Sequence, residues 1–111
     1  MELAALRQRA VDVRGRYAEL ERAKYGRAWR REDVAMGFVG DVGDLMKHVM
    51  AQEGLRNMPD SERRIAHELA DCLWSVLVLA EMYGVDLEHA FVQTMDDIER
   101  HIDEGLKGPA S

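Results

Sequence analysis

Hydrophobic residues recur along most of this chain at alternating spacings of three and four, and polar residues fill the positions between them. This periodicity is typical of an amphipathic α-helix, in which one stripe of side chains faces a core. In the first such segment, about residues 2–26, the stripe is narrow and the other positions are rich in Arg and Glu. Gly26 is the expected end of that helix. The stripe consists of Leu3, Leu6, Ala10, Val13, Tyr17 and Leu20.

Three further segments show the same helical periodicity, at about 31–53, 61–83 and 87–105. No stretch shows the sustained alternation of apolar and polar residues that is typical of a β-strand. Helices joined by short connections pack against one another as bundles. We therefore expect a single all-α domain spanning residues 1–111, with a four-helix bundle-like architecture.

Residues that favour helix ends flank these segments. Gly54 and Gly84 follow the second and third segments, and a glycine at that position favours termination. Asp60 or Ser61 is the expected N-cap of the third helix, and Asp86 is the expected N-cap of the fourth.

The third segment differs from the others because it is apolar on nearly all sides between Leu69 and Ala80. A helix of that kind is expected to be surrounded by other helices. Four short helices cannot fully enclose one of their own number, so we expect a homo-oligomer. Leu73, Trp74 and Leu77 are expected to be largely buried only in the assembly.

Composition narrows the class of protein. Of the 111 residues, 47% are hydrophobic and 32% are charged, as in ordinary soluble globular proteins. The formal net charge of −6 disfavours nucleic acids and anionic membranes as partners. No stretch resembles a signal peptide or is long enough to span a membrane. The single cysteine, Cys72, excludes an intrachain disulfide, and together these features lead us to expect a cytoplasmic protein.

Two pairs of acidic residues interrupt the apolar faces of the second and third helices. Asp41 and Asp44 are three residues apart, as are Glu68 and Asp71, so the members of each pair are neighbours on their helix. If the two helices pack antiparallel, four carboxylates converge in a low-dielectric space and repel one another. A divalent cation would compensate this repulsion, and ligand sets made only of oxygen favour Mg²⁺ or Mn²⁺. The alternative is that these acids lie on a solvated surface.

The stretches "GDVGDL" and "ELADCLWSVLVLAEMYGVDLEHAF" carry a resemblance to a known family. Over roughly residues 30–100, the chain resembles the MazG-type all-α nucleoside triphosphate pyrophosphohydrolases. Their signature is E-x-x-E, a spacer of variable length, and E-x-x-D. Here it reads Asp41-Val-Gly-Asp44, then 23 residues, then Glu68-Leu-Ala-Asp71.

The resemblance implies a four-helix chain that assembles as a homodimer or homotetramer. It also implies Mg²⁺-dependent hydrolysis of a nucleoside or deoxynucleoside triphosphate to the monophosphate and pyrophosphate. On this basis Asp41, Asp44, Glu68 and Asp71 are the expected metal ligands and catalytic residues.

Four other residues are candidates for substrate binding. Lys47 and Arg64 lie one helical turn from the acids and could hold phosphate. Trp29, which with Tyr25 precedes the acidic helix, could stack on a base or could simply pack against apolar neighbours. Arg100 is the one counterpart of the basic residues that the family carries on its fourth helix.

The chain also departs from the family pattern. Both acids of the first pair are aspartates, one methylene shorter than the family's glutamates, and Gly40 stands where a further acid often precedes them. A non-catalytic MazG-like helical oligomer, acting as a nucleotide-binding or interaction module, is therefore the alternative function. A relation to phosphoribosyl-ATP pyrophosphohydrolase is disfavoured, because its N-terminal Ser-Tyr-Thr segment has no close match here. Gly43 matches a family glycine that lets helices approach closely, whereas the resemblance gives no reason for Gly37.

The histidines and Cys72 add little chemistry at this stage. His48 shares the acidic face and is either a supporting group for the metal site or a core residue. His67, His89 and His101 have no evident ligand spacing, and Cys72 is expected to be a small core residue.

Overall fold

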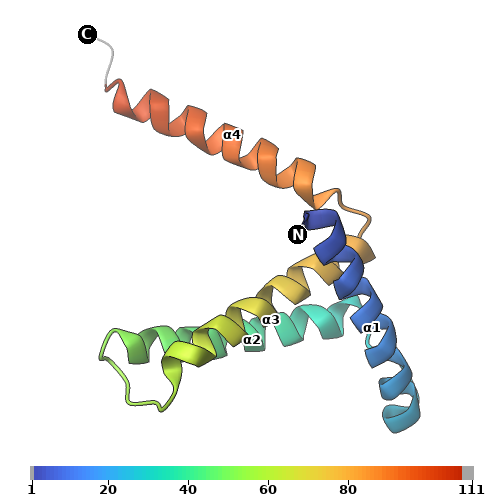
Figure 1. The fold of residues 1–111 in the computed structure, drawn as a ribbon. Helices are drawn as coiled ribbons and strands as arrows, with labels where there is room; N and C mark the ends of the chain where they lie inside the picture. Colours follow the sequence, from blue (N-terminus) through green and yellow to red (C-terminus); the bar gives the residue numbers. More distant parts are fainter. Residues whose placement is uncertain (1, 109–111) are drawn as a thin grey trace.

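The computed structural model describes residues 2–108 and contains four α-helices and no β-strand over that range. The first and second helices are α1 (Leu3–Tyr25) and α2 (Arg31–Gln52). The third and fourth are α3 (Ser61–Met82) and α4 (Leu87–Leu106). Each bound lies within one residue of the range expected from the sequence, and the all-α class is confirmed (Figure 1).

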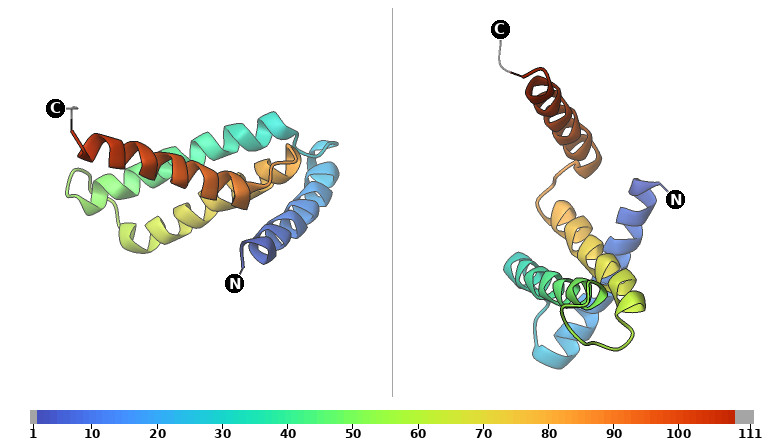
Figure 2. Two further views of the ribbon diagram at one scale, coloured as in Figure 1. Left: turned by 90° about the horizontal axis from the view of Figure 1, so that it is seen from above. Right: turned by 90° about the vertical axis from the view of Figure 1, so that its left-hand side faces the viewer.

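The second and third helices form an antiparallel hairpin, which is the centre of the fold (Figures 1 and 2). At one end, Gln52 Nε2 donates a hydrogen bond of 2.5 Å to Ser61 Oγ, joining the end of α2 to the start of α3. At the other end, the Arg31 guanidinium lies 4.9 Å from the centre of the Tyr83 ring, joining the start of α2 to the end of α3. The antiparallel packing needed to bring the two acidic pairs together is therefore present.

Helix α1 crosses the C-terminal half of α3 and closes a small core (Figure 1). The fully buried members of this core are apolar residues from three helices. They are Ala10 of α1, Val34 of α2, and Leu77 and Val78 of α3. The three helices α1, α2 and α3 thus form one packed body, which we call the three-helix body.

Burial along α3 corrects one expectation from the sequence. Leu77 is only 3% exposed within the single chain, so it does not wait for an assembly to be buried. Trp74 is half-buried and packs edge-to-face with Tyr17, at 6.1 Å between ring centres. Leu73 is 45% exposed, and Leu69 is also exposed, so the apolar surface left uncovered on α3 is narrower than expected.

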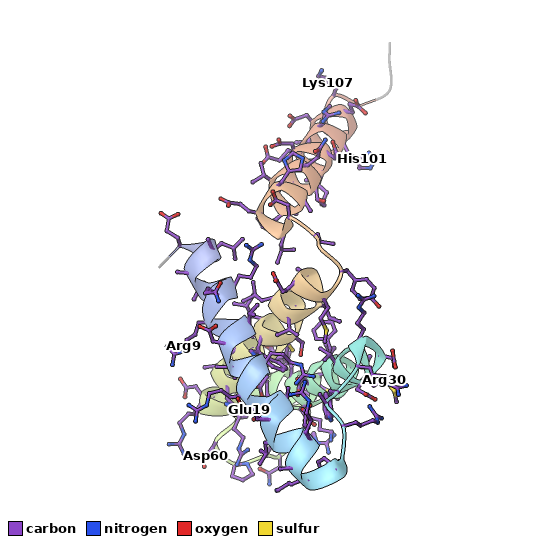
Figure 3. The ribbon with its side chains drawn as sticks, turned by 90° about the vertical axis from the view of Figure 1, so that its right-hand side faces the viewer. Arg9, Glu19, Arg30, Asp60, His101 and Lys107 are labelled. Carbon is purple, nitrogen blue, oxygen red and sulfur yellow. The ribbon has the colours of Figure 1, made fainter. Side chains whose placement is uncertain are left out.

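Helix α4 projects away from the three-helix body instead of closing a four-helix bundle within the chain (Figures 1 and 2). His101 and Lys107 lie on this projecting helix, well apart from the side chains of the body (Figure 3). The Cα radius of gyration is 18.3 Å, whereas a compact chain of this length would have about 13 Å. Within residues 2–108, α4 therefore packs on the body only at its first turn, through Leu87, and no helix lies along the rest of it.

The ends of the helices follow local chemistry. Gly26, Gly54 and Gly84 all adopt positive φ values, of 81°, 77° and 65°, as expected for glycines that terminate helices. Asp86 caps α4, because its carboxylate accepts a hydrogen bond of 3.1 Å from the backbone N–H of His89. Asp60 is the N-cap residue of α3, but it has a φ of 57° and its side chain makes no capping bond.

Two further observations concern the helices as a set. A Cβ built on Gly43 would meet no atom within 4 Å, so the close helix approach expected at this glycine does not occur within the chain. No helix among the described residues is both long enough and apolar enough to cross a membrane.

Candidate metal centre and the adjoining cleft

The acidic pairs of α2 and α3 meet across the hairpin. One carboxylate oxygen from each of Asp41, Asp44 and Glu68 lies within 4.8 Å of the other two. A second group contains an imidazole nitrogen of His67 and carboxylate oxygens of Glu68 and Asp71, again within 4.8 Å of one another. Glu68 belongs to both groups, so the acids form one continuous cluster.

The members of this cluster differ in their exposure. Glu68 is 8% exposed and is held between the helices, whereas the side chains of Asp44 and Asp71 are 52% and 41% exposed. Burial raises the pKa of Asp41, and the nearby carboxylates of Asp71 and Asp44 raise it further. The charged form of Asp41 is therefore disfavoured in the cluster, as expected for a carboxylate that shares a small space with others.

The donor set fits a divalent cation. Among residues 2–108, the ion pairs of the cluster involve only its edge: Lys47 Nζ lies 3.6 Å from Asp44, and His67 Nε2 lies 3.1 Å from Asp71. None of the ion pairs within that range involves Asp41 or Glu68. Carboxylates that are desolvated and lack cationic partners are costly unless a cation compensates them. Oxygen ligands suit Mg²⁺ or Mn²⁺, and the imidazole at the edge also suits a transition metal.

A cleft of about 490 Å³ opens beside the acids, between α1, α2 and α3. Asp41 and Asp71 line one part of it, and Tyr17, Trp29 and Trp74 line another. Its volume lies within the range of sites that bind small molecules and cofactors. The cleft thus places an aromatic wall and two carboxylates within reach of one ligand.

The aromatic wall explains one of the glycines of α2. A Cβ built on Gly37 would lie 3.1 Å from Cζ3 of Trp29, closer than nearly all real contacts of a Cβ. Glycine at this position therefore lets the indole ring lie against the backbone of α2. Because Asp41 follows Gly37 by one helical turn, the ring and the first carboxylate share a face of α2.

The structure places the candidate substrate-binding residues at different distances from this site. Trp29 lines the cleft and Lys47 lies at the edge of the acidic cluster. Arg64 is exposed in the first turn of α3, one turn before Glu68. Arg100 pairs with Asp97 at 2.8 Å on α4, and within the single chain it is not brought to the acids.

Sequence reasoning missed several residues around the site. His67 was expected to lack ligand partners, yet it pairs with Asp71 four residues later, and this i, i+4 spacing was visible in the sequence. Cys72 is half-buried beside the cluster, where burial and the charges of Asp41, Glu68 and Asp71 raise the pKa of its thiol.

The remaining surroundings of the cleft come from tertiary contacts. Tyr17, Glu21 and Trp74 line it, although the periodicity of their helices predicts only that they face some neighbour. His48 is buried at 5% exposure, and its Nδ1 has no hydrogen-bond partner within residues 2–108.

Comparison with known proteins identifies the family. The model of the MazG nucleotide pyrophosphohydrolase domain matches residues 37–103, which is more than half of the chain. The match includes the whole acidic cluster, all of α3 and most of α2 and α4. No curated protein and no solved structure was found to match. The extent of the domain match shows that the chain belongs to the MazG nucleotide pyrophosphohydrolase domain family.

Proposed function

We propose that the protein is a Mg²⁺-dependent nucleoside triphosphate pyrophosphohydrolase that releases pyrophosphate and leaves a nucleoside monophosphate. The observation that carries this proposal is the convergence of Asp41, Asp44 and Glu68 beside a cleft of about 490 Å³ with an aromatic wall. Membership of the family supports the same class of reaction. The substrate is a nucleoside or deoxynucleoside triphosphate.

Each part of the site has a distinct role in this proposal. Asp41, Asp44, Glu68 and Asp71 hold the divalent cation, with Mn²⁺ as an alternative to Mg²⁺. When bound, the cation supplies positive charge to phosphate oxygens and lowers the cost of charge that develops during hydrolysis. Lys47, at the edge of the cluster, is placed to add positive charge near the phosphates.

The triphosphate has to reach the acids while its nucleoside occupies the cleft. Trp29 lines the cleft and is 40% exposed as a residue, and a base can stack on an indole ring. Asp41 and Asp71 line the same cleft, so a nucleoside bound there directs its phosphates toward the acidic cluster. Positioning of this kind is the main contribution of a protein to phosphoryl transfer.

Release of pyrophosphate from a panel of nucleotides tests the proposal. The eight common nucleoside and deoxynucleoside triphosphates are incubated with Mg²⁺, with Mn²⁺ or with EDTA, and pyrophosphate is measured enzymatically. We expect release from at least one substrate with Mg²⁺ or Mn²⁺ and none with EDTA. Release of orthophosphate in place of pyrophosphate, or no release at all, would contradict it.

A non-catalytic nucleotide-binding module is the second candidate. It is favoured by one observation: Asp44, whose side chain is shorter than the family's glutamate, is 52% exposed and paired with Lys47. If this candidate is right, a nucleoside triphosphate binds in calorimetry, in the presence of Mg²⁺, and is recovered intact.

We further propose that the chain assembles with copies of itself, as a homodimer or homotetramer. The projecting helix α4 supports this proposal, because it has a hydrophobic stripe that no other part of the described chain covers. The exposed members of the stripe include Phe91, Ile98, Ile102 and Leu106. Partners other than nucleotide and self are not part of the proposal.

A further inference from the structure

A buried ion pair on α1 is not used by the chemistry proposed above. Arg14 and Glu21 lie on the same face of α1, and Arg14 Nη1 is 3.1 Å from Glu21 Oε1. Their side chains are only 12% and 10% exposed. Helix α1 precedes residue 37, so this pair lies outside the part of the chain that matches the family domain.

Both members of the pair bind the backbone of one residue, Trp29. The backbone N–H of Trp29 donates a hydrogen bond of 2.7 Å to Glu21 Oε1. The carbonyl oxygen of Trp29 accepts a hydrogen bond of 2.6 Å from Arg14 Nη2. Trp29 lies in the connection between α1 and α2, where no helical hydrogen bond fixes the backbone, so these two side chains hold its peptide groups in place.

The fixed backbone determines where the indole ring lies. The ring is against Gly37 of α2 and lines the same cleft as Asp41 and Glu21. Trp29 as a residue is 40% exposed, so its contact with α2 leaves part of it accessible to a ligand. A change in the Trp29 backbone would therefore move the aromatic wall relative to the carboxylates.

Stability alone is a weak reason for this arrangement. Desolvation of two charges offsets most of their attraction, and such pairs are often replaced by apolar residues without loss of stability. Arg14 also has a buried Nε without a hydrogen-bond partner among residues 2–108, which adds to the cost. What the pair does provide is orientation, because charged groups with fixed geometry hold both peptide groups that flank the indole.

We infer that Arg14 and Glu21 are positioning residues that set the affinity of the cleft for the nucleoside end of a substrate, by fixing Trp29 as the stacking wall. This inference rests on the proposed function for the identity of the ligand. It assigns the pair no contact with phosphate or metal. Changes to the pair should therefore alter nucleoside binding and leave the acidic cluster unaffected.

A double-mutant cycle tests the inference through KM and kcat. Trp29→Ala is expected to raise KM for the best nucleoside triphosphate by about fivefold or more, the factor that base–aromatic stacking provides. Glu21→Gln is expected to raise the same KM by a similar factor, with kcat within about twofold of wild type. Because Glu21 acts through Trp29, the double variant should be no worse than Trp29→Ala alone.

Two controls separate positioning from a general structural effect. Glu81→Gln removes an exposed carboxylate that pairs with Arg7 at 3.9 Å, and it should leave KM unchanged. Inorganic triphosphate has no base, so any hydrolysis of it should be unaffected by Glu21→Gln. The inference would be overturned if KM of the double variant rose by the product of the two single-variant factors. It would also be overturned if Glu21→Gln reduced hydrolysis of inorganic triphosphate as much as that of the nucleotide.

Binding of nucleoside monophosphates gives a readout that does not need catalysis. Isothermal titration with the nucleoside monophosphates of the five common bases first identifies the one that binds most tightly. Its dissociation constant should rise about fivefold or more in Glu21→Gln and in Trp29→Ala, and by the same factor in the double variant. If the wild type binds monophosphate in this way but hydrolyses nothing, the proposed reaction fails and the positioning role stands. If Glu21→Gln leaves that binding unchanged, the positioning role fails, whatever the activity.

Circular dichroism first establishes that each variant is folded. If Glu21→Gln does not fold, Arg14→Lys replaces it in the cycle. Lysine keeps a positive charge beside Glu21, but its single nitrogen on a shorter side chain cannot reproduce the fixed geometry in which two guanidinium nitrogens hold Glu21 and the Trp29 carbonyl. Arg14→Lys with wild-type KM and monophosphate affinity would equally overturn the inference.

Discussion

Glu68 is the only acid of the cluster that is buried, at 8% exposed, and it pairs with no cation among residues 2–108. Asp44 and Asp71, by contrast, lie at the edge, where they are open to water and have Lys47 and His67 as neighbours. A buried carboxylate without a cationic partner favours the folded state little unless a bound cation compensates it. Glu68 is therefore the first residue to test.

Glu68→Gln and Asp44→Asn should each reduce pyrophosphate release by about 100-fold or more. Loss of a group that merely supports a metal ligand costs about 10- to 100-fold, so loss of a ligand should cost at least the upper value. The melting temperature should stay the same or rise, because each change removes a repelling charge and keeps the side-chain volume. Steady-state kinetics and thermal melts measure the two effects.

Asp97→Asn is the matched control for these variants. Asp97 is an exposed aspartate on α4 that pairs with Arg100, so the change removes one negative charge far from the cluster. It should keep wild-type turnover. Near wild-type turnover of Glu68→Gln would instead show that the site is assigned wrongly.

Asp33 provides a residue-scale prediction that is independent of any ligand. Its carboxylate accepts hydrogen bonds of 2.9 Å from the backbone N–H of Arg30 and from Arg27 Nη1. The bond from the Arg30 backbone and that from Arg27 hold the pKa of Asp33 below its ordinary value. A carboxyl group with a lowered pKa in the folded state stabilises the fold above its ordinary pKa, and this contribution is lost as pH falls through the folded-state value.

The free energy of unfolding of Asp33→Asn should therefore lie below that of the wild type at pH 7. The difference should shrink as the pH is lowered below about 4, the ordinary pKa of an aspartate. Urea unfolding of both proteins between pH 7 and pH 3 measures it. A difference that stays constant over this range would exclude ionised Asp33 as a cap of α2.

At the scale of the elements, the α2–α3 hairpin assembles the candidate metal site. Glu68 of α3 approaches Asp41 and Asp44 of α2 only when the two helices are packed. The unfolded chain separates them by a long stretch of sequence, so a divalent cation should bind the folded hairpin far better than the unfolded chain. Such differential binding stabilises the folded state.

Mg²⁺ or Mn²⁺ at ten times its dissociation constant should stabilise the fold by about 1.4 kcal/mol per site. For a domain of this size, that corresponds to a rise of several degrees in the melting temperature. The comparison is made against NaCl at matched ionic strength and at fixed protein concentration, because screening and association also shift the transition. A melt with Mg²⁺ that overlays the NaCl melt would count against a metal site.

The double variant Asp44→Asn with Asp71→Asn sharpens this test. Without metal it should melt at a higher temperature than the wild type, since two repelling carboxylates are neutral. With Mg²⁺ it should show little of the ion-specific increment. Acids on a merely solvated surface would give a variant that melts close to the wild type under both conditions.

The helices and the acidic pairs could be predicted from the sequence because both depend on local geometry. A period of 3.6 residues fixes which side chains share a face, so Asp41 and Asp44 are neighbours on any α-helix. The positive φ of Gly84 and the capping bond of Asp86 likewise involve only a few consecutive residues. Such features do not depend on how the helices are arranged in space.

The aromatic half of the cleft could not be predicted in the same way. Tyr17, Trp29 and Trp74 come from α1, the following connection and α3, and they meet only because α1 crosses α3 at one particular place. The reason for Gly37 likewise lies in a contact with Trp29, eight residues earlier and outside the same helix. The crossing of two helices depends on the packing of many side chains, which the periodicity of one helix does not specify.

At the scale of the whole molecule, the extended shape of the chain is compatible with the proposed assembly. Its extents are 67 × 40 × 27 Å, and its long dimension includes α4, which packs on the body only at its first turn (Figure 1). Light scattering at micromolar concentration should therefore give a mass of at least twice the chain mass of 12.6 kDa. A measured mass equal to that of one chain would refute the proposed assembly.

Ile98→Glu should dissociate the assembly or reduce its affinity strongly. Ile98 lies in the centre of the hydrophobic stripe of α4 and is 46% exposed in the single chain, so a partner would bury the introduced charge. Gln93→Glu introduces the same charge on the opposite side of α4 and is the matched control. Equal masses for both variants and the wild type in sedimentation or light scattering would exclude this stripe as the interface.

The isolation of α4 also bears on how the backbone exchanges hydrogen with solvent. A helix of 20 residues that contacts the body only at its first turn opens readily in water, whereas the amides of α2 and α3 are protected by the core between them. On dilution, deuterium should therefore enter the amides of residues 87–106 first, while the hairpin that carries the acids retains its protons. Protein concentration would then determine how well α4 is protected from exchange, through the proposed assembly, without altering the carboxylates at the site.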